Sequence, residues 1–223
     1  MLLRLREAVA DFSMLLTKGY GDKSALKLVG DRFSLTQRQR LAVMRSSCSD
    51  QQRESRRARC VPLEALAGHS VAIDGYNLLI TIEAALSRGL IFRGCDGCCR
   101  DLASIHGTYR RVEETIPAVR LIGDFLTEIR IAQALWLLDS PVSNSGRLRA
   151  LVDELARTNG WPWEVRLTIS PDAELSRIDM TVVSTDSVVL DTCGPWTNLA
   201  AGIITRRLDA ITVVDLSPDP GSS

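Results

Sequence analysis

Apolar side chains in the N-terminal part of the chain recur at helical spacing and predict helices without strands. In "LREAVADFSMLL", residues 5–16, an apolar residue follows every three or four positions, and Gly19 stands where a helix usually ends. A second helix is predicted from about Ser24. A third is predicted over "SLTQRQRLAVMR", in which Ser34 and Gln37 have the spacing of a capping box. Residues 1–66 are therefore expected to form a small helical domain.

From Val71 onward the pattern changes to short apolar strands that alternate with longer amphipathic helices. Strands are predicted in "VAIDGYNLLI", "ALWLLDSPV", "WEVRLTI", "DMTVVSTDSVVLD" and "AITVVDL", with helices at 113–130 and 146–160. This alternation predicts an α/β domain over 67–216 with a central, mainly parallel sheet flanked by helices. The remaining residues, 217–223, are rich in Ser, Pro and Gly and are expected to be a disordered tail.

Composition narrows the class of protein. The chain of 223 residues has 27 basic and 27 acidic residues, so a uniformly basic, polyanion-binding surface is excluded. No apolar run approaches the roughly 20 residues that span a bilayer, and no signal peptide is evident. Six unevenly spaced cysteines do not suggest a disulfide scaffold. A cytoplasmic protein without membrane association is the expectation.

Three of the predicted strands end at, or break just before, an aspartate. These residues are Asp74, Asp139 and Asp186. In an open parallel sheet, ligands bind outside the carboxyl ends of the strands, so the fold can bring these distant carboxylates into one pocket. Clustered carboxylates repel one another unless a cation lies among them, and their hard oxygen ligands suit Mg²⁺ or Mn²⁺. Each aspartate could instead cap the helix or turn that follows it.

Short motifs around these aspartates resemble a known superfamily. "IDGYN", "LLDSPVSNSG" and "STDSVVLD" look like the successive acidic motifs of the PIN-like nucleases, including their NYN branch. The chain is also similar to an uncharacterised prokaryotic family whose C-terminal part is regarded as PIN-like. The similarity lies in the order of a basic helical segment, "AIDGYNLLITIEAAL", "CRDLASIHGTYRR", "LDSPVSNSG" and "TDSVVLD". The first resemblance covers the chain from about residue 71, and the second covers essentially all of it.

The resemblance implies a metal-dependent ribonuclease with Asp74, Asp139 and Asp186 as catalytic metal ligands and Asn77 in the polar shell. It also implies a fourth acid from a helix between the first two. Asp101 is the first choice for that acid, and its rivals are Glu83, Asp96 and Asp191. PIN-like proteins often dimerise, which makes a homodimer a hypothesis to test.

Several other residues are candidates for binding substrate. Ser143, Asn144 and Ser145 precede a predicted helix, so they could bind a phosphate or simply cap the helix. The basic N-terminal segment could contact nucleic acid or form a solvated helix face, and Arg110 and Arg111 could add to it. Its arginines are Arg38, Arg40, Arg45, Arg53, Arg56, Arg57 and Arg59. A zinc site at Cys95, Cys98 and Cys99 lacks the second C-x-x-C pair that such sites usually have.

Three functional classes follow from these patterns. The leading interpretation is a divalent-metal nuclease, and within that class an endoribonuclease, whose basic helices hold RNA. The second is an inactive PIN-like module that binds RNA or a protein, which the missing helical Glu of many PIN nucleases favours. The third is a small-molecule phosphohydrolase with Asp74 as nucleophile, although the second Asp usual in that class is replaced by Tyr76.

Overall fold

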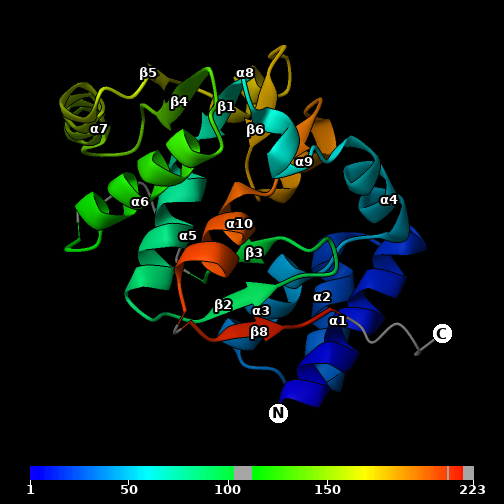
Figure 1. Ribbon diagram of the computed structural model, residues 1–223. Coiled ribbons are helices and arrows are strands. Elements are labelled where there is room, and N and C mark those ends of the chain that lie inside the picture. The colour runs from blue at the N-terminus through cyan, green and yellow to red at the C-terminus, as the bar shows by residue number, and fades with distance from the viewer. Residues whose placement is uncertain (103–111, 210, 218–223) are drawn as a thin grey trace. The chain divides into compact units, whose positions relative to one another are not determined.

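The computed structural model describes residues 1–102, 112–209 and 211–217 (Figure 1). These residues form two compact units, each built from separated stretches of the chain. The first contains residues 1–58, 90–102 and 212–217, and the second contains 59–89, 112–209 and 211. The predicted split into domains 1–66 and 67–216 therefore differs from the units in where it assigns 59–66, 90–102 and 212–217. As a statement about independent folding, that split stays a prediction.

The first unit begins with helices that bury the apolar stripes seen in the sequence. In α1, Leu5, Val9 and Phe12 are buried, as their helical spacing predicts. They pack with Val29 of α2 and Val43 of α3 in one hydrophobic cluster. The helices are α1 (Leu2–Thr17), α2 (Asp22–Arg32), α3 (Gln37–Ser46) and α4 (Asp50–Arg59). The N-terminal segment of the chain is thus helical, as predicted.

A small sheet completes the first unit. Its order is β3-β2-β8, with β2 antiparallel to β3 and parallel to β8. The strands are β2 (Ile91–Arg93), β3 (Cys99–Arg100) and β8 (Val213–Asp215). Phe92 and Leu216 are buried in the same cluster as the helices. The strand predicted in "AITVVDL" is therefore real, but it belongs to this small sheet and not to the large one.

The second unit is built on a five-stranded sheet in which all neighbouring strands are parallel. Its order is β5-β4-β1-β6-β7, so β1 lies at the centre. The strands are β1 (Ser70–Asp74), β4 (Gln133–Asp139), β5 (Trp163–Thr168), β6 (Thr181–Val183) and β7 (Trp196–Thr197). Residues 134–138 of β4 are all buried, as expected for an inner parallel strand covered on both faces.

Helices flank this sheet, which confirms the predicted α/β class. Within the unit, α5 packs against α6 and α10, and α7 lies along β5 (Figure 1). The helices are η1 (Leu63–Leu66), α5 (Gly75–Leu86), α6 (Thr115–Glu128), α7 (Ser145–Asn159), α8 (Pro171–Leu175), α9 (Ser187–Thr192) and α10 (Leu199–Arg207). No helix within the described ranges is long and apolar enough to cross a membrane.

The predicted capping box at Ser34 and Gln37 is wrong by two positions. The box is formed by Thr36 and Gln39: the Gln39 N–H donates to Thr36 Oγ1 at 3.3 Å, and the Thr36 N–H donates to Gln39 Oε1 at 2.9 Å. Ser34 instead has a left-handed backbone with φ of 49°. The sequence contains both spacings, and the turn that precedes α3 selects the second.

Candidate functional site

Asp74 ends the central strand β1 and is nearly buried, with 9% of its surface exposed. The Ser184 hydroxyl, just after β6, donates a hydrogen bond of 2.8 Å to Asp74 Oδ2. Burial raises the pKa of Asp74 to about 7, the Ser184 bond opposes the rise, and the charges of Asp186 and Asp172 add to it. The carboxylate therefore lies in a site that favours either a proton or a cation.

Gly75 allows α5 to begin directly against the neighbouring strand. A Cβ atom at this position would lie 2.6 Å from Leu138 Cδ2 and 2.9 Å from the Leu137 carbonyl oxygen. Such distances are too short for any side chain, so glycine is required by the close approach of α5 to β4. The "DGYN" sequence thus places Asp74 at the strand end and starts the helix in the next residue.

Asn77 connects the end of β1 to the segment after β6. Its side-chain oxygen accepts hydrogen bonds from the Thr185 backbone N–H at 2.9 Å and the Thr185 hydroxyl at 3.0 Å. Together with the bond from Ser184 to Asp74, these contacts join the two motifs that were singled out in the sequence, "IDGYN" and "STD". The side-chain oxygen of Asn77 thus holds the loop that carries Asp186.

Asp139 ends β4, beside Asp74 in the sheet order. Its Oδ1 atom is buried and has no hydrogen-bond partner among the described residues. Burial, and then the charge of Asp139, raises the pKa of the Tyr76 phenol to about 12. A buried carboxylate oxygen without a donor is costly and is commonly explained by an ion or water that the protein binds.

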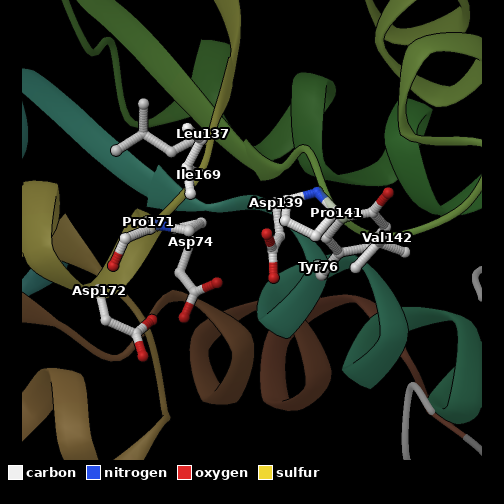
Figure 2. A pocket seen from close by; sticks show the side chains of 10 residues that line it. Asp74, Tyr76, Leu137, Asp139, Pro141, Val142, Ile169, Pro171 and Asp172 are labelled. Atoms are coloured by element: carbon white, nitrogen blue, oxygen red, sulfur yellow. The ribbon is translucent and has the colours of Figure 1, made fainter. Parts of the chain in front are cut away.

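A pocket of about 360 Å³ opens between these strand ends. Figure 2 shows the carboxylates of Asp74, Asp139 and Asp172 facing the same open side of this pocket. The lining residues are Asp74, Tyr76, Leu137, Asp139, Pro141, Val142, Ile169, Ser170, Pro171 and Asp172. The pocket lies at the carboxyl ends of β1 and β4 and beside the loop after β5, where parallel sheets commonly bind ligands.

Asp172 is the site residue that the sequence reasoning missed. It lies in the first turn of α8, just after β5. Burial raises its pKa, as do the charges of Asp186 and Asp139. A search that included the turn after each predicted strand would have found this aspartate, because "WEVRLTI" was predicted as a strand and "SPD" follows it. The strand was recognised, but the aspartate lies beyond its end rather than at it.

Asp186 has the capping role that was left open in the sequence analysis. Its Oδ1 accepts hydrogen bonds from the backbone N–H groups of Val188 at 2.8 Å and Val189 at 3.4 Å, at the start of α9. The residue is exposed and does not line the pocket, although its charge raises the pKa of both Asp74 and Asp172. It is therefore a neighbour of the pocket and also a helix cap.

Of the candidates for the fourth acid, Glu83 and Asp191 belong to the same unit as the carboxylate pocket but do not line it. Asp101 belongs to the first compact unit and forms an ion pair with Arg45 at 3.5 Å. Glu83 is buried in α5, where its carboxylate accepts a hydrogen bond of 2.6 Å from Thr115. Asp96 is paired with two arginines, and Asp191 is exposed on α9. Asp172 is thus the additional acid that the structure places at the pocket.

Of the three candidate residues at the start of α7, one serine is buried and the other two residues are exposed. Asn144 occupies the N-cap position with a left-handed φ of 70°. The Ser145 hydroxyl donates to the Ser140 carbonyl at 3.2 Å and is buried, whereas Ser143 is exposed. Among these three residues, Ser143 and Asn144 remain on the surface, where a phosphate could reach them.

Most of the N-terminal arginines form contacts inside the protein. Arg40, Arg45, Arg53 and Arg56 pair with Asp31, Asp101, Asp50 and Asp96, respectively. Arg59 donates to backbone carbonyls, including that of Leu190 at 2.8 Å. Arg38 and Arg57 are exposed. Arg110 and Arg111 lie outside the described residues.

The positions of the acidic side chains determine whether the pocket could hold a metal ion. Within 1–102, 112–209 and 211–217, no three His, Cys, Asp or Glu side chains are close enough to hold one ion as they stand. The donors at the pocket nevertheless fit Mg²⁺ or Mn²⁺, because Mg²⁺ needs only one or two carboxylates and retains several waters. The partnerless Asp139 oxygen and the desolvated Asp74 carboxyl are the pair that would hold it.

Comparison with known proteins identifies the family of the chain but not its activity. Residues 63–202 match the family described as Domain of unknown function (DUF5616), so the chain belongs to that family. Residues 4–59 match a second description, Protein of unknown function (DUF434). The uncharacterized protein MJ0935 of Methanocaldococcus jannaschii is 28% identical over 188 residues, which cover 84% of this chain and 89% of that protein. No solved structure matches.

Proposed function

We propose that this member of the DUF5616 family is a divalent-metal-dependent nuclease, with RNA as its substrate and the carboxylate pocket as its catalytic site. The observation that carries the proposal is the pocket itself. Asp74 and Asp139 line it from the ends of the adjacent strands β1 and β4, Asp172 lines it from the first turn of α8, and one buried Asp139 oxygen lacks a donor among the described residues. The resemblance of the "IDGYN" and "STD" motifs to PIN-like nucleases supports the same activity.

The negative charge of the pocket supports a role for a cation. The charges of Asp186 and Asp172 raise the pKa of Asp74, and those of Asp186 and Asp139 raise the pKa of Asp172, because a carboxylate is more costly to ionise beside another. Mg²⁺ or Mn²⁺ held by Asp74 and Asp139 would supply a nucleophilic water and offset the charge that develops on the phosphate. Asp172 and Asp186 would hold the waters around the ion.

The surrounding polar contacts would fix the orientation of these carboxylates. The Ser184 hydroxyl donates to Asp74 Oδ2, and a hydrogen bond from the Asn77 backbone also holds this carboxylate. Asn77 holds Thr185, and so positions the turn that carries Asp186. The Tyr76 phenol stays protonated at neutral pH, because its pKa is raised to about 12, and it can donate to a phosphate oxygen in the pocket.

The substrate class is inferred from the residues around the pocket. Arg177 and Arg166, which also pairs with Glu164 and Glu174, line a shallow hollow that shares Ile169 and Ser170 with the carboxylate pocket. Cationic side chains beside a phosphodiester-cleaving site would contact the flanking phosphates of a polynucleotide. The exposed Arg38 and Arg57 remain candidates for further phosphate contacts.

The test is cleavage of labelled single-stranded RNA, structured RNA and single-stranded DNA by the full chain with Mn²⁺, Mg²⁺ or EDTA. Asp74→Asn and Asp139→Asn should each lower the rate by at least about 100-fold, because they remove the groups that would bind the ion. Asp153→Asn is the matched control, since Asp153 is on the surface of α7 and its carboxylate pairs with Arg149 at 3.6 Å. Its activity should equal that of the wild type.

The products identify the chemistry. Hydrolysis by water leaves a phosphate monoester, whereas metal-independent contaminating ribonucleases leave a 2′,3′-cyclic phosphate. Cleavage that persists in EDTA, or that is equal in Asp74→Asn and wild type, would contradict the proposal. If the wild type binds RNA without cleaving any substrate and calorimetry detects no Mn²⁺ binding, the protein is an RNA-binding module instead. Hydrolysis of a small phosphomonoester but not of RNA would indicate a phosphohydrolase.

A further inference from the structure

Two cysteines that are distant in sequence meet in the first compact unit. Cys48 lies in the connection between α3 and α4, and Cys95 lies in the turn between β2 and β3. Their Sγ atoms are 3.1 Å apart. A disulfide bond has an S–S distance of about 2.05 Å, so a shift of roughly 1 Å would join them. The carboxylate pocket of the second unit plays no part in this contact.

The backbone around Cys95 is held against the Cys48 segment. The Cys95 N–H donates to the Ser46 carbonyl at 2.9 Å. A side chain on Gly94 would have its Cβ 2.9 Å from that carbonyl oxygen, so glycine permits the close approach. Asp96 is fixed by Arg56 at 2.6 Å and by Arg100 at 2.6 Å. These contacts hold the two thiols together before any bond forms.

The surroundings of the two sulfurs distinguish their chemical roles. The Cys48 side chain and backbone N–H both lie against Cys95 Sγ, with the N–H at 3.1 Å, and Ser13 Oγ is 3.9 Å away. The hydrogen bond from the Cys48 side chain, with these further contacts, lowers the pKa of Cys95 to about 7 despite burial and the charge of Asp96. The same hydrogen bond, together with burial, raises the pKa of Cys48. Cys95 accepts the Cys48 N–H and is the less buried of the two residues, so it is the better placed to react as a thiolate, with Cys48 as the resolving thiol.

We propose that Cys48 and Cys95 form a peroxide-oxidised thiol pair that closes reversibly to a disulfide. The Cys95 thiolate attacks one oxygen of hydrogen peroxide, the O–O bond breaks, and hydroxide leaves to form water, which gives a sulfenic acid at Cys95. Cys48 sulfur then attacks Cys95 sulfur, the S–O bond breaks, and the departing hydroxide takes the Cys48 proton as water. Two thiols and one peroxide become one disulfide and two waters. A dithiol reductant reverses the reaction by exchange.

The remaining cysteines provide an internal comparison. Cys98 and Cys99 are buried, and burial raises the pKa of both thiols. Cys193 is buried, and desolvation raises the pKa of its thiol. Cys60 is exposed as a residue, but its thiol is partly desolvated by neighbouring atoms, which raises its pKa as well. Thiols with raised pKa values react slowly with peroxide at neutral pH. Oxidation by a small excess of peroxide should therefore be confined to the Cys48–Cys95 pair.

The test is peptide mapping of the full chain after treatment with hydrogen peroxide at neutral pH and alkylation under denaturing conditions. We expect a mass loss of about 2 Da, a peptide pair joined through Cys48 and Cys95, and full alkylation of the other four cysteines. The melting temperature should rise by roughly 5 to 10 °C on oxidation and fall again with dithiothreitol, because the bond closes a long loop.

Two variants separate the roles of the sulfurs. In Cys48→Ser, the sulfenic acid at Cys95 has no resolving thiol and should be trapped by dimedone, whereas Cys95→Ser should give no dimedone adduct at Cys48. Cys60→Ser is the control and should oxidise like the wild type. Circular dichroism shows whether each variant is folded. If a variant does not fold, the peptide map of the oxidised wild-type protein still decides whether Cys48 and Cys95 become linked. A different linked pair, or modification of Cys60 with no Cys48–Cys95 peptide, would overturn the proposal.

Discussion

Individual buried carboxylates in this protein are stabilised in different ways. Asp74 has hydrogen bonds from the Ser184 hydroxyl and the Asn77 backbone and has acidic neighbours, and its pKa is raised to about 7 by burial. Burial would also raise the pKa of Asp96, but the charges and hydrogen bonds of Arg100 and Arg56 outweigh it and hold that pKa well below its usual range. A carboxylate with paired arginines is a structural group, whereas one that lacks a cation is suited to bind one.

The pairing of Asp96 leads to a prediction about stability. Asp96→Asn leaves the guanidinium groups of Arg56 and Arg100 buried without their counter-ion. We expect the free energy of unfolding to fall by about 3 to 5 kcal/mol, measured by urea unfolding. The exposed pair of Arg149 and Asp153 provides the comparison, and Asp153→Asn should cost less than about 1 kcal/mol.

The pH dependence of the stability lost in Asp96→Asn provides the control. The pKa of Asp96 is lower in the folded than in the unfolded chain, where it is about 3.9, so its stabilisation is present above that value and is lost as pH falls below it. The melting temperatures of wild type and Asp96→Asn should therefore differ most above about pH 5 and converge toward pH 2. A difference that stays constant from pH 7 to pH 2 would show that the ion pair is not its cause.

At the scale of elements, the sequence predicts the two strands, β1 and β4, whose ends carry Asp74 and Asp139. Apolar runs ending in aspartate identified β1 and β4, because an inner parallel strand is apolar along its length and its ligands lie beyond its carboxyl end. Asp172 was missed because it lies past its strand, in the first turn of α8. Asp101, the first choice for a fourth acid, belongs to the first compact unit and not to the unit that holds the pocket, and position in the sequence does not reveal which unit holds a residue.

The start of α3 shows the limit of local patterns and gives a second prediction. Thr36 rather than Ser34 caps this helix, and Ser34 lies in the left-handed region. Thr36→Ala should lower the free energy of unfolding by about 1 kcal/mol, because it removes the acceptor for the Gln39 N–H. Ser34→Gly should cause no loss, because glycine adopts a positive φ without strain. Urea unfolding of both variants measures this contrast, and a larger loss in Ser34→Gly would place the cap at Ser34.

At the scale of the whole molecule, the chain enters the first compact unit three times. Residues 90–102 and 212–217 supply the sheet β3-β2-β8, and this sheet packs with helices from the first 58 residues. Phe92 and Leu216 are 5% and 0% exposed in that cluster, beside Val9 and Val43. The spacing of apolar residues and the runs of β-branched residues describe only local structure. They separated a helical segment from an α/β segment, but they could not show that the later strands β2, β3 and β8 pack with the N-terminal helices in the first unit.

This arrangement predicts that cutting the chain between residues 66 and 67 divides one hydrophobic core. Fragment 67–223 would expose Phe92 and Leu216, and burying each such side chain is worth about 1.5 to 3 kcal/mol. Fragment 1–66 would lack the same two side chains against α1 and α3. We expect each fragment alone to melt below the full chain and to bind a hydrophobic dye, and the two to co-purify when expressed together. If 67–223 instead melts in one sharp transition at the temperature of the full chain and does not bind 1–66, the boundary drawn from the sequence separates independent domains, and the strands at 91–93 and 213–215 do not depend on the helices for their stability.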